Sequence, residues 1–172
     1  MDCELDWGGR TKGNLGIRYG LPLILDEFNK NNIKALFFIS TELLNDYKKD
    51  IKRIQDYGHT LGSHGHFHIV YKDKWRAHAD MQISKLLLSG ITGKPDCYYR
   101  APKFNYQLDN EPYSRRDGMS LLKMMWTGQR SENIYLHPFD LVTAKNPPNT
   151  FCRLWYSRPK KACKLFKELC KS

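Results

Sequence analysis

The fold is decided by the stretch Ile33–Ser63, which reads IKALFFISTELLNDYKKDIKRIQDYGHTLGS. Its first seven residues form a short apolar run of the kind that builds a buried strand. Ser40 or Thr41 supplies the N-cap of a helix over residues 42–57, and residues 60–63 form a second short strand. Two strands joined by a helix favour parallel pairing through a right-handed crossover.

The same alternation of helices and strands continues on both sides of this stretch. We expect helices over residues 21–31 and 73–90, near 119–125 and near 159–170, and strands over 96–100 and 133–136. Strands that alternate with helices predict a mostly parallel sheet, and 172 residues are one domain of common size. We therefore predict an α/β fold in a single domain, 1–172, with a basic C-terminal helix over about 159–170.

The composition is that of a globular protein with a surplus of positive charge. Hydrophobic residues make up 41% of the chain, and the formal net charge is +10. After Cys152, seven lysines and arginines are opposed only by Glu168 and the C-terminus. Such a tail can touch an anionic surface or substrate, but a solvated basic helix is the simpler interpretation. No nucleic-acid recognition motif accompanies the charge, so we expect no nucleic-acid partner.

The sequence carries no signal for membrane insertion or secretion. No stretch approaches the roughly eighteen consecutive apolar residues of a membrane span, and the N-terminus has neither the basic nor the apolar region of a signal peptide. The five cysteines include no CxxC pair, which indicates reduced structural thiols. We therefore expect a cytoplasmic protein without a transmembrane segment, and the oligomeric state stays open.

A cluster of histidines follows the second strand. Four of the six histidines fall within Gly58–His68, which reads GHTLGSHGHFH. Histidine is the commonest metal-ligating side chain, and His64 and His68, four residues apart, point at one ion if the segment turns like the start of a helix. A hydrolytic metal site normally has three protein ligands and one open position for water. We expect the third ligand among the acids of residues 2–6.

Acidic residues at the N-terminus complete such a site. Asp2 and Glu4 share one face of a strand, so one can ligate the ion while the other takes a proton from bound water; Asp6 is the weaker candidate. Two histidines and a carboxylate favour zinc or a neighbouring transition metal over magnesium. The ion polarises a substrate carbonyl and activates its water, and His137, on a different strand end, is a suitable acid for a leaving amine.

Polar residues lie at the ends of several predicted strands. Parallel sheets of this kind carry their functional residues at the carboxyl ends of the strands. The residues in such positions are Asp2, Glu4, His64, His68, Arg100 and His137. We therefore expect separate segments of the chain to send these groups to one rim of the sheet.

Four segments resemble, in order, the motifs of the polysaccharide deacetylases, also called the NodB-homology or carbohydrate esterase family 4 group. GHTLGSHGHFH is similar to the second motif, which binds metal, and MDCELDWGGR (1–10) is similar to the Asp-x-Glu variant of the first. YYRAPKF (98–104) resembles the Arg-x-Pro motif of the groove wall, and IYLHPFDL (134–141) resembles the His-Pro motif of the general acid. The resemblance covers about residues 1–142.

This resemblance implies an irregular, shortened (β/α) barrel of mostly parallel strands, a deformed TIM barrel. It also implies a metal-dependent hydrolase that removes N-acetyl groups, or alternatively O-acetyl groups, from an N-acetylated glycan or glycan-linked substrate. The metal is expected to be zinc, with cobalt, nickel or manganese as alternatives. The implied roles are general base for Asp2, metal ligand for Glu4, His64 and His68, base orientation for Arg100 and general acid for His137. The roles of Asp2 and Glu4 could be exchanged.

Further residues are candidates for substrate contact. Aromatic rings can stack on sugar faces, Arg10 can face an anionic substrate group, and a backbone N–H beside Tyr99 or Arg100 can help to hold an oxyanion. The candidates are Trp7, Arg10, Tyr99, Pro102, Phe104 and Trp126. Asp117 is the candidate partner of His137. The alternative functions are a non-catalytic carbohydrate-binding member of the same fold and a C–N hydrolase acting on a small cyclic amide.

Overall fold

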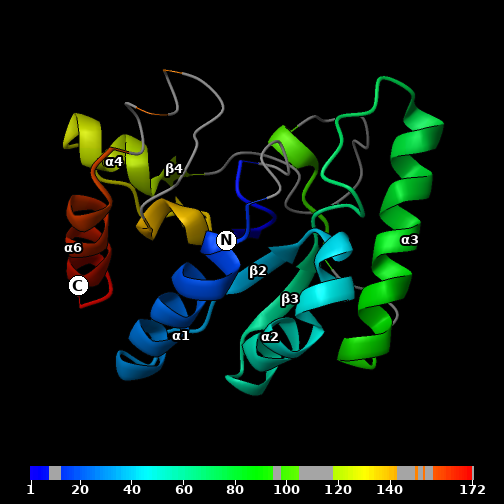
Figure 1. Cartoon of the computed structure of the whole chain (residues 1–172), viewed down its shortest axis with the longest axis horizontal. Helices are drawn as coiled ribbons and strands as arrows, with labels where there is room; N and C mark the ends of the chain where they lie inside the picture. The colour runs from blue at the N-terminus through cyan, green and yellow to red at the C-terminus, as the bar shows by residue number, and fades with distance from the viewer. Residues whose placement is uncertain are drawn as a thin grey trace. The chain divides into compact units, whose positions relative to one another are not determined.

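A computed structural model describes residues 1–7, 13–94, 98–104, 118–142, 150, 153 and 157–171. The chain divides into two compact units, which are treated separately below (Figure 1). The first, the sheet unit, holds Asp2–Glu4 and Ala35–Arg116, and the second, the helical unit, holds Met1, Leu5–Lys34 and Asp117–Ser172.

The sheet unit contains a three-stranded parallel sheet in the order β1-β2-β3. The strands are β1 (Asp2–Cys3), β2 (Leu36–Ile39) and β3 (Thr60–Ser63). Cys3 pairs with Ile39, and Ile39 pairs with Ser63, so the carboxyl ends of all three strands lie at one edge. An isolated parallel bridge from Ser63 to Tyr99 extends this ladder. The predicted parallel pairing is confirmed.

Helices pack on both sides of β3 in the sheet unit (Figure 1). The short helix η2 (Thr41–Leu43) leads into α2 (Leu44–Asp56), and α3 (Lys74–Thr92) follows β3; η3 (Pro102–Phe104) comes later. The Asp73 side chain caps α3 by accepting the N–H of Trp75. Gly93, at φ +69°, ends α3 in the left-handed conformation.

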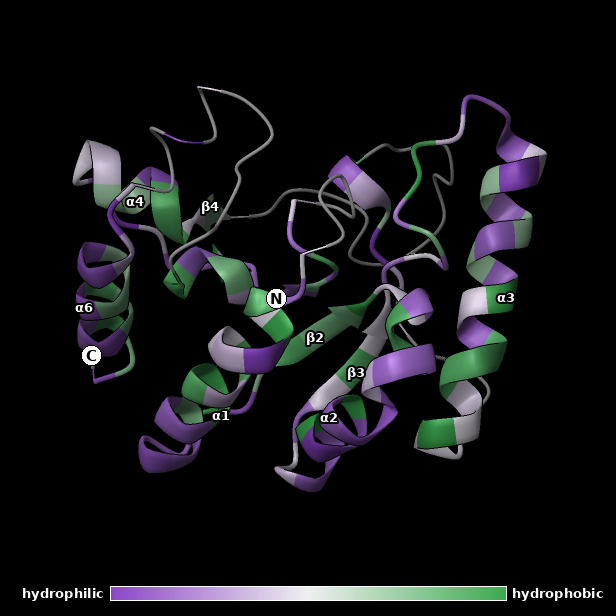
Figure 2. Cartoon of the chain, in the orientation of Figure 1, coloured by the Kyte–Doolittle hydropathy of each residue, from purple (hydrophilic) through white to green (hydrophobic). Residues whose placement is uncertain are grey.

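The core of the sheet unit is formed by the apolar strands. Phe37, Phe38 and Ile39 are almost completely buried, and Figure 2 shows β2 as a hydrophobic strand. This continuous run is typical of a strand covered on both faces. The buried apolar run therefore forms the central strand, β2, with which both β1 and β3 pair.

The helical unit has a small parallel sheet and several helices. Its elements are η1 (Gly16–Gly20), α1 (Leu21–Lys30), β4 (Met119–Ser120), α4 (Leu121–Thr127), β5 (Ile134–Tyr135), η4 (Pro138–Leu141) and α6 (Pro159–Leu169). Phe28 and Phe166 pack α1 against α6, with ring centroids 5.6 Å apart. Gly20 lies against η4, where an added Cβ would come 1.9 Å from the Pro138 carbonyl oxygen.

The predicted elements differ from the structure mainly in strand length. The strand expected over residues 33–39 begins only at Leu36, because the Ile33 N–H is bonded to the Phe28 carbonyl in the turn after α1. Residues 95–97 of the strand expected over 96–100 lie outside the described residues, and of residues 98–100 only Tyr99 makes a bridge. The strand expected over 133–136 is reduced to Ile134–Tyr135.

The α/β class is confirmed, whereas the described strands form one sheet of three and one of two without closing into a barrel. The helices expected over 21–31 and 73–90 are present as α1 and α3. Among the described helices, none combines the length and the apolar character that a membrane span requires.

Candidate metal centre

Three side chains that could ligate a metal ion converge in the sheet unit at the carboxyl ends of β1 and β3. Glu4 follows β1, and His64 follows β3. Glu4 Oε2 lies 2.5 Å from His68 Nε2 and 3.4 Å from His64 Nε2. The three ligand atoms all lie within 4.8 Å of one another, and the side chains are nearly buried. The structure therefore brings the two predicted histidines together with Glu4.

The His64 ring is oriented by the backbone of the neighbouring segment. His64 Nδ1 lies 2.7 Å from the Arg100 carbonyl oxygen. A carbonyl only accepts hydrogen bonds, so Nδ1 carries a proton, and the ring presents Nε2 to Glu4. Metal-binding histidines commonly donate their second ring N–H to a carbonyl or carboxylate in this way.

The loop between the two histidines is held tightly against η2 and α3. The Gly65 carbonyl accepts the Thr41 N–H at 3.0 Å, and the His66 carbonyl accepts the Glu42 N–H at 3.0 Å. Gly65 has φ +81°, which an L residue rarely adopts. His68, at φ +40°, also has a positive φ. Such a conformation is costly for a residue with a side chain and often marks a functional position.

Asp80 on α3 contacts the loop between His64 and His68, and the sequence did not predict this contact. This buried carboxylate accepts the His66 N–H through Oδ2 at 2.8 Å and the Tyr71 hydroxyl through Oδ1 at 3.2 Å. A Cβ on Gly65 would lie 2.7 Å from the same Oδ2. The available signal was an acid on the buried face of α3, beside Met81 and one turn before Ser84.

Asp2, the predicted base, is paired with Arg100. Arg100 Nη1 donates to Asp2 Oδ1 at 2.7 Å, and both side chains are buried. The guanidinium lies 4.1 Å from the centroid of Phe38 and 5.4 Å from that of Phe104. The structure therefore places the predicted orienting arginine on Asp2, and Phe104, a predicted sugar contact, lies against that arginine.

The bridge from β3 to Tyr99 removes the Arg100 N–H as a candidate for oxyanion binding. The Arg100 N–H donates to the Ser63 carbonyl at 2.9 Å, so it is used in the ladder and not available for a substrate. Tyr99 itself is buried. Pro102 lies near the loop, with its Cγ 3.6 Å from a Cβ built on Gly65.

His137, the predicted acid, lies in the helical unit with a carboxylate partner. Its Nδ1 is 3.6 Å from Asp140 Oδ1, and its backbone N–H donates to Asp140 Oδ2 at 2.9 Å. The imidazole stacks on Phe139 at 4.8 Å. Asp117, the predicted partner, lies outside the described residues. The sequence did not predict Asp140 as the partner, because an acid three residues after His137 is most simply interpreted as part of the turn that follows.

Two other candidates of the helical unit, Trp7 and Trp126, contact side chains of the same unit. Trp7 is buried, with its ring 5.5 Å from that of Phe139, and the Arg158 guanidinium lies 4.7 Å from the Trp126 ring centroid. Arg10 lies outside the described residues.

Asp6, the weaker candidate for the third ligand, is used in the helical unit. Its carboxylate accepts the N–H groups of Leu15 and Gly16 at 2.8 and 2.9 Å. Burial raises the pKa of this carboxyl, and the two backbone N–H groups partly offset that effect. Asp6 therefore stabilises the entry into η1 and is not one of the three clustered ligands.

Comparison with known proteins connects this geometry to one family. The family model described as polysaccharide deacetylase matches residues 16–121, well over half of the chain. A peptidoglycan-N-acetylglucosamine deacetylase from Bacillus cereus is 38% identical over 87 residues, which cover 47% of this chain and 30% of that protein. A chitin deacetylase from Arthroderma benhamiae is 35% identical over 89 residues, covering 48% and 24%. The chain thus spans less than a third of either relative.

A solved structure shares the fold over nearly the whole chain. The peptidoglycan deacetylase PdaC from Bacillus subtilis superposes with a TM-score of 0.65 at 14% sequence identity. The match covers 99% of this chain and 80% of that one. At this identity the likeness concerns the fold alone.

Proposed function

This chain belongs to the polysaccharide deacetylase family, and we propose that it removes N-acetyl groups from a glycan with a divalent metal ion held by Glu4, His64 and His68. The observation that carries the proposal is the convergence of one carboxylate oxygen and two imidazole nitrogens at the strand ends. The glycan is proposed by likeness to relatives that are named as deacetylases of peptidoglycan and chitin.

The three side chains fit a small divalent ion of the zinc type. Ligand atoms about 2.0–2.2 Å from a tetrahedral ion lie about 3.4 Å apart, and Glu4 Oε2 and His64 Nε2 are separated by 3.4 Å. The contact between His68 Nε2 and Glu4 Oε2 is shorter, 2.5 Å, and would lengthen on ligation. Two imidazoles and a carboxylate favour zinc, with cobalt, nickel or manganese as alternatives.

A bound ion of this kind activates a water molecule and polarises the substrate carbonyl. Asp2 is the proposed base that accepts the proton of the attacking water. The Arg100 guanidinium donates to Asp2 Oδ1 at 2.7 Å and so fixes that carboxylate in one orientation. A base must be held within reach of the proton it takes, so this pair supports Asp2 as base and Glu4 as ligand.

His137 is the proposed general acid for the leaving nitrogen. Asp140 lies on its Nδ1 side, 3.6 Å away, where a carboxylate can orient the imidazole. The acid role follows from the resemblance of residues 134–141 to the His-Pro motif and from this partner. An amine leaves only with a proton, whereas an alkoxide from an O-acetyl group depends less on the acid.

The test is acetate release from an N-acetylglucosamine oligomer by the full chain. We expect release that stops with a chelator and returns with zinc. Glu4→Gln and His64→Ala should abolish it, whereas His78→Ala, which removes an exposed histidine on α3, should leave it intact. An O-acetylated oligomer run in parallel separates the amide from the ester. Metal-dependent glycan binding without any acetate release would instead identify a non-catalytic member of the family.

A further inference from the structure

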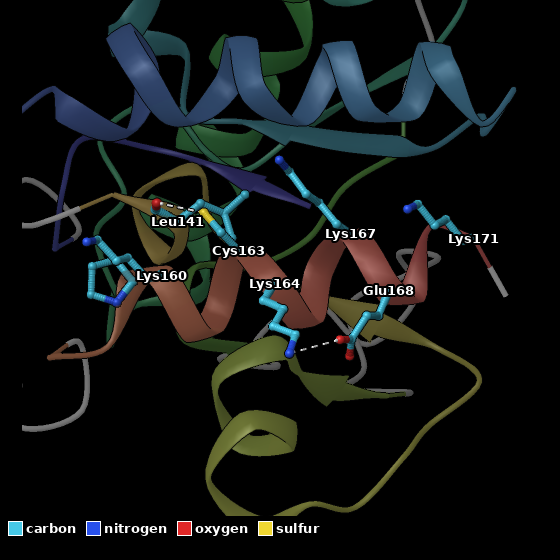
Figure 3. Close-up of a pocket in the computed structure, with 8 residues that line it drawn as sticks. Leu141, Lys160, Cys163, Lys164, Lys167, Glu168 and Lys171 are labelled. Carbon is cyan, nitrogen blue, oxygen red and sulfur yellow. Dashed lines mark hydrogen bonds and ion pairs between the residues drawn. The ribbon is translucent and has the colours of Figure 1, made fainter.

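Four lysines line one hollow on the surface of the helical unit. Lys160, Lys164, Lys167 and Lys171 follow the helical spacing of four, three and four residues along α6 and its end. The hollow has a volume of about 590 Å³, and Leu141 and Pro159 also contribute to it. Figure 3 shows these lysines spread along one side of the helix. We call them the α6 lysine face.

The α6 lysine face is not required to hold the helix in place. The opposite side of α6 carries Ala162, Leu165 and Phe166, which are buried, and Figure 2 shows the two kinds of surface as separate bands. The apolar side therefore accounts for the packing of α6. The four lysines are exposed to solvent and available to a ligand.

Two features of the arrangement oppose helix stability, whereas Lys167 and Lys171, at the C-terminal end of α6, are favoured by the helix dipole. Lys160 lies in the first turn of α6, where the positive end of the helix dipole disfavours a cation. Lysines three or four residues apart repel one another along a helix face. Glu168, the one acid among the described residues of the hollow, lies 4.0 Å from Lys164. In the described part of the chain, no carboxylate pairs with Lys160, Lys167 or Lys171.

The thiol in the hollow adds no negative charge. Cys163 Sγ donates to the Leu141 carbonyl oxygen at 3.1 Å (Figure 3). Burial raises the pKa of this thiol, although the charge of Lys167 partly opposes the shift. The hollow therefore presents a net positive charge to a ligand at neutral pH.

The chemistry of this face favours a linear polyanion. The lysines span about 16 Å along the helix axis, which suits charges repeated along a chain rather than one small ion. Lysine acts as a mobile point charge without the fixed fork of arginine. No large hydrophobic side chain of the described part of α6 is exposed, as insertion into a membrane would require. Among the described residues that line the hollow there is no aromatic side chain, as base stacking would require.

We propose that the α6 lysine face binds an acidic polysaccharide, a chain of sugars with repeated carboxylate groups. The choice of a polysaccharide among polyanions rests on the proposed deacetylase function. The binding itself needs neither the metal nor turnover, so a failure of one proposal leaves the other testable.

The test is the affinity of the full chain for fluorescently labelled oligogalacturonate, measured by fluorescence anisotropy. Its methyl ester, with the same backbone and no charge, is the matched control ligand and should not bind. Substitution of all four lysines of the face by glutamine should weaken binding at least tenfold. The logarithm of the association constant should fall with the logarithm of the salt concentration at a slope of about −3, as expected when four lysines contact a flexible polyanion.

A control variant separates the face from net charge. Lys30, Lys48, Lys49 and Lys74 are exposed lysines on α1, α2 and α3, and their joint replacement by glutamine removes the same charge. This control should weaken binding less than threefold, with both variants checked for folding by circular dichroism. Equal losses in the two variants would overturn the proposal, as would binding of the methyl ester or tighter binding of single-stranded DNA of equal charge.

Discussion

The buried carboxylate of Asp80 accepts the backbone N–H of His66, 2.8 Å away. This bond ties α3 to the middle of the loop whose two ends are His64 and His68. Partners that orient metal ligands commonly contribute 10- to 100-fold to metal affinity. The contact therefore connects a helix interior to the geometry of the proposed metal centre.

We predict that Asp80→Ala weakens zinc binding about 10- to 100-fold, because the loop loses its acceptor for the His66 N–H. Asp80→Asn keeps one acceptor oxygen and should recover most of the affinity. Zinc affinity is measured by competition with a chromophoric chelator, and thermal unfolding of the metal-free variants reports any general loss of stability. Gln82→Ala, at an exposed position of the same helix, is the control. Unchanged zinc affinity in folded Asp80→Ala would contradict this positioning role.

The two acids of the first segment are predicted to respond differently to neutralisation. Asp2→Asn should lower acetate release by about 10²- to 10⁴-fold, the usual effect of losing a general base, and leave zinc affinity within a few-fold. Glu4→Gln should lose both activity and zinc. Acetate release and zinc stoichiometry are measured on the same preparations. If Asp2→Asn loses zinc while Glu4→Gln keeps it, the two roles are exchanged.

The strands and the two histidines could be predicted from local patterns in the sequence, namely the apolar run of β2 and the polar residues at strand ends. These patterns left Asp2 and Glu4 equivalent, and the choice of Glu4 came from the family resemblance; Glu4, His64 and His68 do converge. Asp80 could not be predicted, because its partner is a backbone N–H fourteen residues away. Strand lengths also depend on distant turns, as the Ile33 N–H bonded to the Phe28 carbonyl shows.

A close approach of backbone in the helical unit gives a stability prediction. A Cβ on Gly20 would lie 1.9 Å from the Pro138 carbonyl oxygen, so Gly20→Ala forces η1 away from η4. We expect a loss of about 1–3 kcal/mol in the free energy of unfolding, as for other overpacked sites. Gly90→Ala is the matched control, since no atom lies within 4 Å of its built Cβ. Urea denaturation of both variants measures the difference, and equal stability would refute the close contact.

The thiol of Cys170 is predicted to be unreactive at neutral pH. Burial, and to a lesser extent the nearby Glu27 carboxylate, raises its pKa to about 11. The thiol is therefore protonated at pH 8, where about one molecule in a thousand carries the reactive thiolate. Iodoacetamide labelling of the Cys170 peptide, followed by mass spectrometry, should accelerate about tenfold per pH unit from pH 8 to 10. In the urea-unfolded chain the rate should level off near pH 8.5, and the same plateau in the folded protein would contradict the shift.

The central claim is that Glu4, His64 and His68 hold one divalent ion. The most direct measurement is an anomalous difference map at the zinc edge from crystals of the full chain grown with zinc. We expect a single strong peak about 2.0–2.2 Å from a Glu4 carboxylate oxygen and from Nε2 of both histidines, with Asp2 still paired to Arg100. A map without a peak at these three side chains, or with a peak ligated by Asp2 in place of Glu4, would contradict the claim.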